Sequence, residues 1–192
     1  TINDDGLSFI SDISEAKPYQ FINSDIFAQA YASYLVGLSD VALPDNHYDA
    51  PLYGFLMKSL DLIEEKIDMV VVTFIFELQV MSRFGAQLDF GQCVFCHRKD
   101  LPMDFSYKFN GCLCRNHFDE DMKRSHVDPN VIFLCQSFMA MDLEKLPSIN
   151  LSDDLKKKIR VFIDALYDHY IGVQIKAKKF IDGLDGWADI MK

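Results

Sequence analysis

The sequence predicts a mainly α-helical bundle that carries a small zinc-ribbon-like insert and a short N-terminal β-hairpin. Three observations lead to this fold class. Apolar residues recur at three- and four-residue spacing over most of the 192-residue chain. Two cysteine-containing knuckles interrupt that pattern near the middle. The residues are 49% hydrophobic and 13% aromatic, which suffices for a core and excludes an intrinsically disordered chain.

The first ten residues are typical of two short strands around a turn. Asp5-Gly6 separates Thr1-Ile2 from the β-forming stretch Leu7 to Ile10, and Gly accepts the positive φ angle that such a turn needs. Because an isolated two-stranded hairpin is marginally stable in water, we expect it to complete a sheet whose other strands are missing. The alternative is a small flap on a helical body.

Three helices are expected before the knuckles. The first opens at Ser24-Asp25, where Ser caps the first turn and Asp favours its positive end, and it breaks at Pro44-Asp45-Asn46. The second begins around Asp49-Ala50-Pro51. The third spans Met69 to Phe84. Its β-branched stretch Val70 to Thr73 favours a strand locally, but its length and continued helical spacing favour a buried helix.

The helical pattern resumes after residue 126. Asp128-Pro129 places an N-cap before a Pro at the first helical position, where the missing N–H costs nothing. Ser152 caps the next helix, and Gly172 is its expected terminator. A last amphipathic segment is expected from Val173 to about Leu184. No repeat or Ser/Gly-rich linker is visible, which favours one helical unit with an insert.

Charge is unevenly distributed along the chain, which has a net charge of −10. Residues 1–92 carry four basic and 14 acidic side chains, whereas residues 93–192 carry 15 of each. A uniformly basic nucleic-acid binder is therefore excluded, and an anionic partner must find a local patch in the second half. The longest apolar run, Met69 to Phe76, is too short to span a bilayer, and no secretory signal is visible. We therefore expect a cytoplasmic protein with reduced thiols and no membrane contact.

The strongest chemical signal is a pair of knuckles in the insert, at about residues 90–122. Cys93-x-x-Cys96 is followed by Cys114-x-x-His117, and each two-residue spacing lets both side chains converge on one metal ion. Four protein ligands would close the tetrahedron, so the spacing predicts a structural zinc site. Because an insert this small cannot build its own core, the metal would supply its folding free energy.

Alternatives to this ligand set remain open. Cys112 or His97 could replace a ligand, and the cysteines could be ordinary reduced thiols. Cys135 is expected on an apolar helix face as a small buried hydrophobe. A metalloenzyme would require one of the four ligands to give way to water. The adjacent Cys96 and His97 have no third orienting group in the sequence, so we assign no catalytic residue.

Basic side chains form two clusters near the end of the chain. The first consists of Lys156, Lys157, Lys158 and Arg160, and the second of Lys176, Lys178 and Lys179 with Phe180 beside them. Clustered cations could meet phosphates or an acidic peptide. The ordinary alternative is a solvated helix face on which Lys stems cover apolar surface.

Further motifs occur in a fixed order along the chain. They are Phe76-Glu77-Leu78, Phe84-Gly85 with Gln87-Leu88, the Cys93 knuckle, Asn110-Gly111 before Cys114, Ile159-Arg160, Tyr167, Tyr170-Ile171-Gly172 and Ile175 to Phe180. In this order they resemble the C-terminal region of the bacterial RecO family of recombination mediators, from about residue 7 to 187. The knuckles alone are generic, whereas the stretch before them and the Lys-rich ending make the resemblance specific.

The resemblance implies an N-terminal OB-fold barrel followed by a helical domain with a zinc-ribbon-like insert. Residues 1–14 would be a remnant of the barrel and residues 15–192 the helical domain. Such proteins are not enzymes and have no small-molecule substrate. They act in DNA repair by annealing single-stranded DNA and, with RecR, by helping to load RecA onto DNA coated by single-stranded-DNA-binding protein.

The helical domain of the family also engages the acidic C-terminal tail of that coating protein. Cations beside an apolar groove would suit such a tail, which makes the two basic clusters and Phe180 candidates for partner or DNA binding. The chain departs from the family at His117, where a fourth Cys is frequent, at His97, where Gly is common, and at Ala177, where Ser is usual. Some members lack the zinc ligands, which favours a scaffolding role for the metal. The second interpretation is a zinc-stabilised protein-interaction module without a nucleic-acid role.

Overall fold

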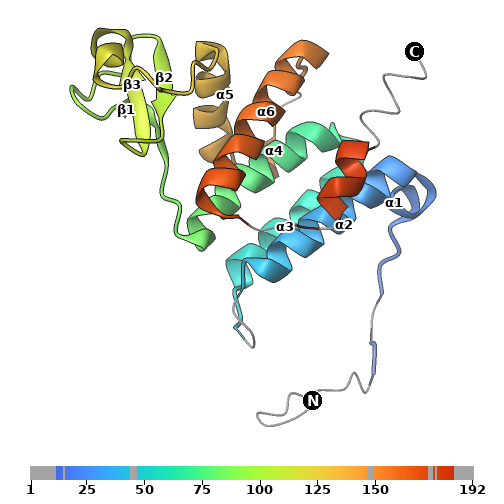
Figure 1. Ribbon diagram of the computed structural model, residues 1–192. Helices are drawn as coiled ribbons and strands as arrows, with labels where there is room; N and C mark the ends of the chain where they lie inside the picture. Colours follow the sequence, from blue (N-terminus) through green and yellow to red (C-terminus); the bar gives the residue numbers. More distant parts are fainter. Residues whose placement is uncertain are drawn as a thin grey trace.

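A helical body with a small β-sheet at one end forms the structure (Figure 1). The computed structural model describes residues 12–14, 16–43, 47–146, 149–172, 175 and 177–183. The helices are α1 (Gln20–Ser24), α2 (Ile26–Val41), α3 (Ala50–Glu64), α4 (Met69–Val80), α5 (Pro129–Met139) and α6 (Asp153–Tyr170), with 3-10 turns η1 (Met81–Phe84), η2 (Arg115–Glu120) and η3 (Leu143–Lys145). The strands are β1 (Asp89–Cys93), β2 (Met103–Ser106) and β3 (Gly111–Cys114). The predicted mainly helical fold is confirmed.

Helix α4 lies at the centre of the body. It contacts α2, α3, α5 and α6, and every residue from Val71 to Leu78 is at most 1% exposed. A helix that is apolar on all sides is stable when other helices surround it. This burial explains why the β-branched stretch is helical. The Thr73 hydroxyl is buried away from solvent and donates to the Met69 carbonyl at 2.7 Å.

Most helix starts follow the expected caps, but the start of α2 differs. Its N-cap is Asp25, whose carboxylate accepts from the N–H groups of Phe27 (2.9 Å) and Ala28 (2.8 Å). Ser24 instead ends α1, a short helix that the sequence analysis missed. The first N–H groups of α1 donate to the distant Glu64 carboxylate at 2.7–3.0 Å. No local pattern could have indicated that cap.

We expect Asp25→Ala to lower the free energy of unfolding by about 1 kcal/mol, because two helix N–H groups lose their acceptor. Ser24→Ala is the matched control and should change the unfolding free energy by less than about 0.5 kcal/mol. Urea denaturation followed by circular dichroism measures both values. A larger loss of unfolding free energy for Ser24→Ala than for Asp25→Ala would show that Ser24 is the N-cap.

The C-terminal end of α6 follows the sequence prediction. Gly172 has a φ angle of 66°, which a residue with a Cβ rarely adopts, and its N–H donates to the Tyr167 carbonyl at 2.9 Å. Beyond it, Ile175 packs so closely on α2 that a Cβ added at Gly37 would lie 3.2 Å from its Cγ2 atom. Residues 177–183 are helical, which confirms that part of the predicted last segment.

Several sequence predictions lie outside the described residues. They are the hairpin at residues 1–10, the break at Pro44-Asp45-Asn46, Lys176, and parts of the segment from Val173 to Leu184. Among the helices that are described, none combines the length and apolar character needed to cross a membrane.

The insert folds as a three-stranded sheet in the order β1-β3-β2. Strands β2 and β3 form an antiparallel hairpin, with Phe105 opposite Cys112, and β1 runs parallel to β3. One face packs on the helical body, where the Phe162 ring of α6 lies 6.0 Å from that of Phe90 and 5.7 Å from that of Phe105. The insert therefore shares the core of the body, which refines the expectation that a metal alone would stabilise it.

Candidate metal centre

Four side chains converge at the outer end of this sheet. Cys93 ends β1, Cys96 lies in the following turn, Cys114 ends β3 and His117 lies in η2. Their ligand atoms all lie within 4.8 Å of one another. The Cys93 Sγ atom is 3.6 Å from His117 Nδ1, Cys114 Sγ is 3.4 Å from the same nitrogen, and the Sγ atoms of Cys96 and Cys114 are 3.6 Å apart.

These separations fit one zinc ion. A tetrahedron with metal–sulfur bonds of about 2.3 Å and a metal–nitrogen bond of about 2.0 Å has edges of about 3.5–3.8 Å. The predicted set Cys93, Cys96, Cys114 and His117 therefore could hold the ion. Neither Cys112 nor His97 belongs to this group among the described residues. Four protein ligands would leave no position for water or substrate on the ion.

The first knuckle owes its shape to its backbone hydrogen bonds. The His97 N–H donates to the Cys93 carbonyl at 2.8 Å, and the Cys93 N–H donates to the Arg98 carbonyl at 2.9 Å. Closing this turn gives His97 a φ angle of 55°. A left-handed residue is least costly as Gly. The turn therefore provides the physical reason why Gly suits the position that His97 occupies here.

The thiols do not divide by acidity into ligands and other cysteines, because the pKa of Cys93 is lowered whereas burial raises that of Cys114. Burial acts to raise the pKa of Cys93, but backbone N–H groups of Cys114, Cys96 and Phe95 lower it to about 6. A thiolate is the metal-binding form of Cys. Burial raises the pKa of Cys112, and it raises that of Cys135 to about 12, so both remain neutral thiols. Cys135 is 0% exposed on α5, as expected.

The first basic cluster holds α6 against the rest of the body. Lys156 pairs with Asp68, the N-cap of α4. Lys158 pairs with Asp154 at 2.9 Å and more weakly with Asp128, the N-cap of α5. Lys157 lies exposed on the same helix. Lys156 and Lys158 are therefore already paired with carboxylates of the same chain.

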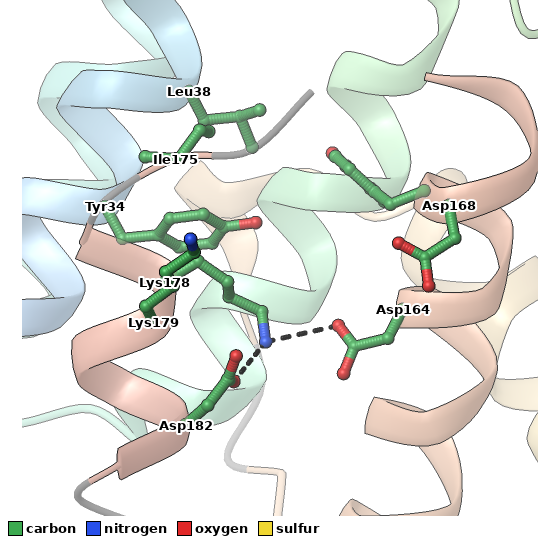
Figure 2. A pocket seen from close by; sticks show the side chains of 9 residues that line it. Tyr34, Leu38, Asp164, Asp168, Ile175, Lys178, Lys179 and Asp182 are labelled. Carbon is green, nitrogen blue, oxygen red and sulfur yellow. Dashed lines mark hydrogen bonds and ion pairs between the residues drawn. The ribbon is translucent and has the colours of Figure 1, made fainter. Parts of the chain in front are cut away.

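Lys178 and Lys179 of the second basic cluster line a pocket of about 300 Å³ (Figure 2). Its lining residues are Tyr34, Leu38, Asp164, Tyr167, Asp168, Ile175, Lys178, Lys179 and Asp182. The Lys178 ammonium reaches between two carboxylates, 3.2 Å from Asp164 and in direct contact with Asp182. Lys179 is exposed, and Phe180 is 48% exposed. Three carboxylates line the pocket, so its interior is a poor environment for an acidic peptide.

Comparison with known proteins places the chain in a family. The sequence profile described as Recombination protein O C terminal matches residues 23–179. The chain belongs to the RecO family. It is 58% identical over 192 residues to DNA repair protein RecO of Lactococcus lactis subsp. lactis (strain IL1403), and this match covers all of the chain and 76% of the relative.

Two streptococcal relatives extend this comparison. The proteins named DNA repair protein RecO from Streptococcus thermophilus (strain CNRZ 1066) and Streptococcus suis (strain 05ZYH33) are 53% and 48% identical over 191 residues. Each match covers all of this chain and 74% of the relative. No solved structure matches the chain.

The RecO-like motif Phe76-Glu77-Leu78 contains a charged residue whose partners the sequence analysis missed. Glu77 is 0% exposed in the middle of α4. The Arg160 guanidinium of α6 donates to both of its carboxylate oxygens, at 2.7 and 2.9 Å, and the Tyr34 hydroxyl of α2 donates to one of them at 2.6 Å. An acid inside a continuous apolar run is the signal that could have indicated a buried ion pair. Arg160 therefore has a structural partner within the chain.

Proposed function

We propose that this member of the RecO family is a mediator of DNA repair and homologous recombination. In this role it helps to anneal single-stranded DNA and to load RecA onto DNA coated by single-stranded-DNA-binding protein. The observation that carries the proposal is the identity of 58% over the whole chain to a protein named DNA repair protein RecO. The chain would serve as a docking and scaffold domain in the cytoplasm, with RecR and the coating protein as partners and no catalysed reaction.

In this proposal zinc has a structural role in a ribbon-like insert. A closed set of three Cys and one His supports that role, because a catalytic zinc keeps an open position. The ion would fix the outer knuckles, while the shared aromatic core fixes the inner face of the sheet. The division into a barrel remnant at residues 1–14 and a helical domain at residues 15–192 remains a prediction.

We place the docking site for the acidic tail on the rim of the pocket rather than inside it. Lys178 is already paired with two carboxylates, and its side chain is only 17% exposed. Lys179 is exposed next to the half-exposed Phe180. A cation beside an aromatic ring suits a peptide that ends in acidic residues and an aromatic residue. Lys179 and Phe180 are thus the best candidates among the described residues of the second cluster.

Titration with a labelled peptide of that composition tests the docking site. We expect Lys179→Glu to weaken binding about threefold to tenfold, because a surface charge pair contributes up to about 1 kcal/mol and reversal makes it repulsive. Lys145→Glu is the matched control, since Lys145 is equally a surface lysine, with 84% of its side chain exposed, and it should leave the affinity unchanged. Binding should also weaken at higher salt and be absent with a scrambled peptide. Equal affinities of the two variants would show that the tail does not bind at this rim.

A protein-interaction module without a nucleic-acid role is the second candidate. The excess of acidic residues in residues 1–92 favours it, because that half of the chain repels DNA. Saturable tail binding by a chain that neither binds nor anneals single-stranded DNA would establish this alternative.

A further inference from the structure

The imidazole of His117 approaches the other ligands through one particular nitrogen. Its Nδ1 atom lies 3.6 Å from the Cys93 sulfur and 3.4 Å from the Cys114 sulfur. Both distances are close to the edges of a tetrahedron around one zinc ion. The two nitrogens of an imidazole point in different directions, so a ring that directs Nδ1 at the thiols directs Nε2 away from them. Nδ1 is therefore the nitrogen that is placed to bind the ion.

The second nitrogen of this ring does not fix its orientation through a protein hydrogen bond. In most metal sites that nitrogen of a ligating His donates to a carboxylate, a carbonyl or water, and the bond orients the ring. In the described part of the chain, no protein group accepts a hydrogen bond from His117 Nε2. The backbone of η2 also departs from helical geometry at His117, where φ is −124° and ψ is 16°. A contact of another kind must then orient the ring.

The ring of Phe95 supplies such a contact. It stacks on the His117 ring, with centroids 5.4 Å apart and planes at 22°. The Phe109 ring meets Phe95 edge-on, with centroids 4.9 Å apart and planes at 79°. Phe95 lies in the turn between Cys93 and Cys96, whereas Phe109 precedes β3. The three rings thus join the first knuckle to the second knuckle and to the turn before β3.

Phe95 does not belong to the aromatic core that joins the sheet to the helical body. It is 42% exposed, whereas Phe90 and Phe105 are 2% and 0% exposed. Its aromatic contacts within the described residues are those with His117 and Phe109. Replacing Phe95 should therefore change the metal centre without removing contacts from the core.

We propose that Phe95 is a positioning residue, which holds the His117 ring so that Nδ1 faces the thiols. Its side chain has no ligand atom and acts through His117, while Phe109 braces it at an edge contact. A ring that is oriented in advance loses less freedom when the metal binds, so the stacking contact raises the metal affinity. This inference rests on the proposed structural zinc site and is independent of the role in DNA repair.

The zinc affinity of the 192-residue chain, measured by competition with a chromophoric chelator, gives the first test. Phe95→Leu keeps an apolar side chain but removes the flat ring. We expect it to weaken zinc binding about tenfold, the low end for loss of a group that orients a ligand. Phe95→Tyr keeps the ring and should bind zinc within about twofold of the original chain. Phe133→Leu is the matched control, because it makes the same change at a Phe that is 65% exposed on α5, and it should leave the affinity unchanged.

A substitution at Phe109 tests whether its effect passes through Phe95. We expect Phe109→Leu to weaken zinc binding about twofold to threefold, because the Phe95 ring loses its edge contact. In a chain that already carries Phe95→Leu, the second substitution should have less effect than it has alone, because the contact between the two rings is already lost. Fully additive effects would contradict this series of contacts.

NMR of the chain loaded with cadmium-113 and labelled with nitrogen-15 shows which nitrogen binds the metal. In the original chain we expect metal–nitrogen coupling at Nδ1 of His117 alone. In Phe95→Leu we expect a broadened signal, or a second signal with coupling at Nε2, which a loss of stability alone would not produce. Coupling at Nε2 in the original chain would overturn the positioning role. Unchanged affinity with a single Nδ1 signal in Phe95→Leu would also overturn it and leave the zinc site intact, whereas an original chain that binds no zinc would refute the metal site and this inference together.

Discussion

Replacing Cys93 and Cys96 together by Ser is expected to abolish zinc binding. The double variant loses two of four ligands, and a Ser hydroxyl is not ionised at neutral pH as a thiolate is. We expect the zinc content to fall from about one ion per chain to below about 0.1. Mass spectrometry under native conditions or a zinc-sensitive dye measures the content directly.

Loss of the ion should loosen the knuckles and leave the helical body folded. The sheet keeps its contact with α6 through Phe90, Phe105 and Phe162, which does not involve the ion. We therefore expect near-native far-UV circular dichroism, with faster amide hydrogen exchange confined to the turn after β1 and to η2.

Cys135→Ala is the matched control for the ligand variant. Cys135 is a buried thiol outside the metal group, so this variant should keep its zinc and lose only about 1 kcal/mol of stability. Full zinc occupancy in the Cys93→Ser, Cys96→Ser protein would contradict the assignment. Complete unfolding would show that the metal also stabilises the body.

Features that depend on neighbouring residues were predictable from the sequence. The knuckle spacing identified all four members of the metal group, because a two-residue spacing lets both side chains of a knuckle reach one tetrahedral ion. The helix starts at Asp49, Asp128 and Ser152 and the end at Gly172 were predictable for the same reason. Each depends on atoms within a single turn of chain.

Features that depend on contacts between distant segments were not predictable. Helix α1 begins at backbone groups that Glu64 binds from more than 40 residues away. The sheet packs on α6, so the insert has a larger core than its own sequence suggested. The charge pattern from Lys156 to Arg160 indicated a cluster of surface cations. It could not show that Lys156 already pairs with Asp68, the N-cap of α4, and Arg160 with Glu77 of α4. Only the tertiary structure places those partners.

The buried pair between Glu77 and Arg160 carries the largest expected effect on stability. Glu77→Ala would leave the Arg160 guanidinium, only 17% exposed, with Asp164 at 2.7 Å as its remaining carboxylate, and it would leave the Tyr34 hydroxyl without this acceptor. Breaking a buried pair from one side typically costs about 3–5 kcal/mol. We expect that loss in the free energy of unfolding, measured by urea denaturation. Lys17→Ala breaks a pair whose lysine side chain is 67% exposed and should cost below about 1 kcal/mol.

A double variant separates the strength of the pair from the cost of breaking it. Glu77→Leu with Arg160→Met replaces both charges by apolar groups, and such replacements are often close to neutral. We expect the double variant to be at least about 2 kcal/mol more stable than Glu77→Ala, because no unpaired charge remains. The pair would then serve mainly to fix how α2, α4 and α6 pack, since Glu77 joins Tyr34 of α2 to Arg160 of α6. If the double variant were as unstable as Glu77→Ala, the ion pair itself would be the source of the stability.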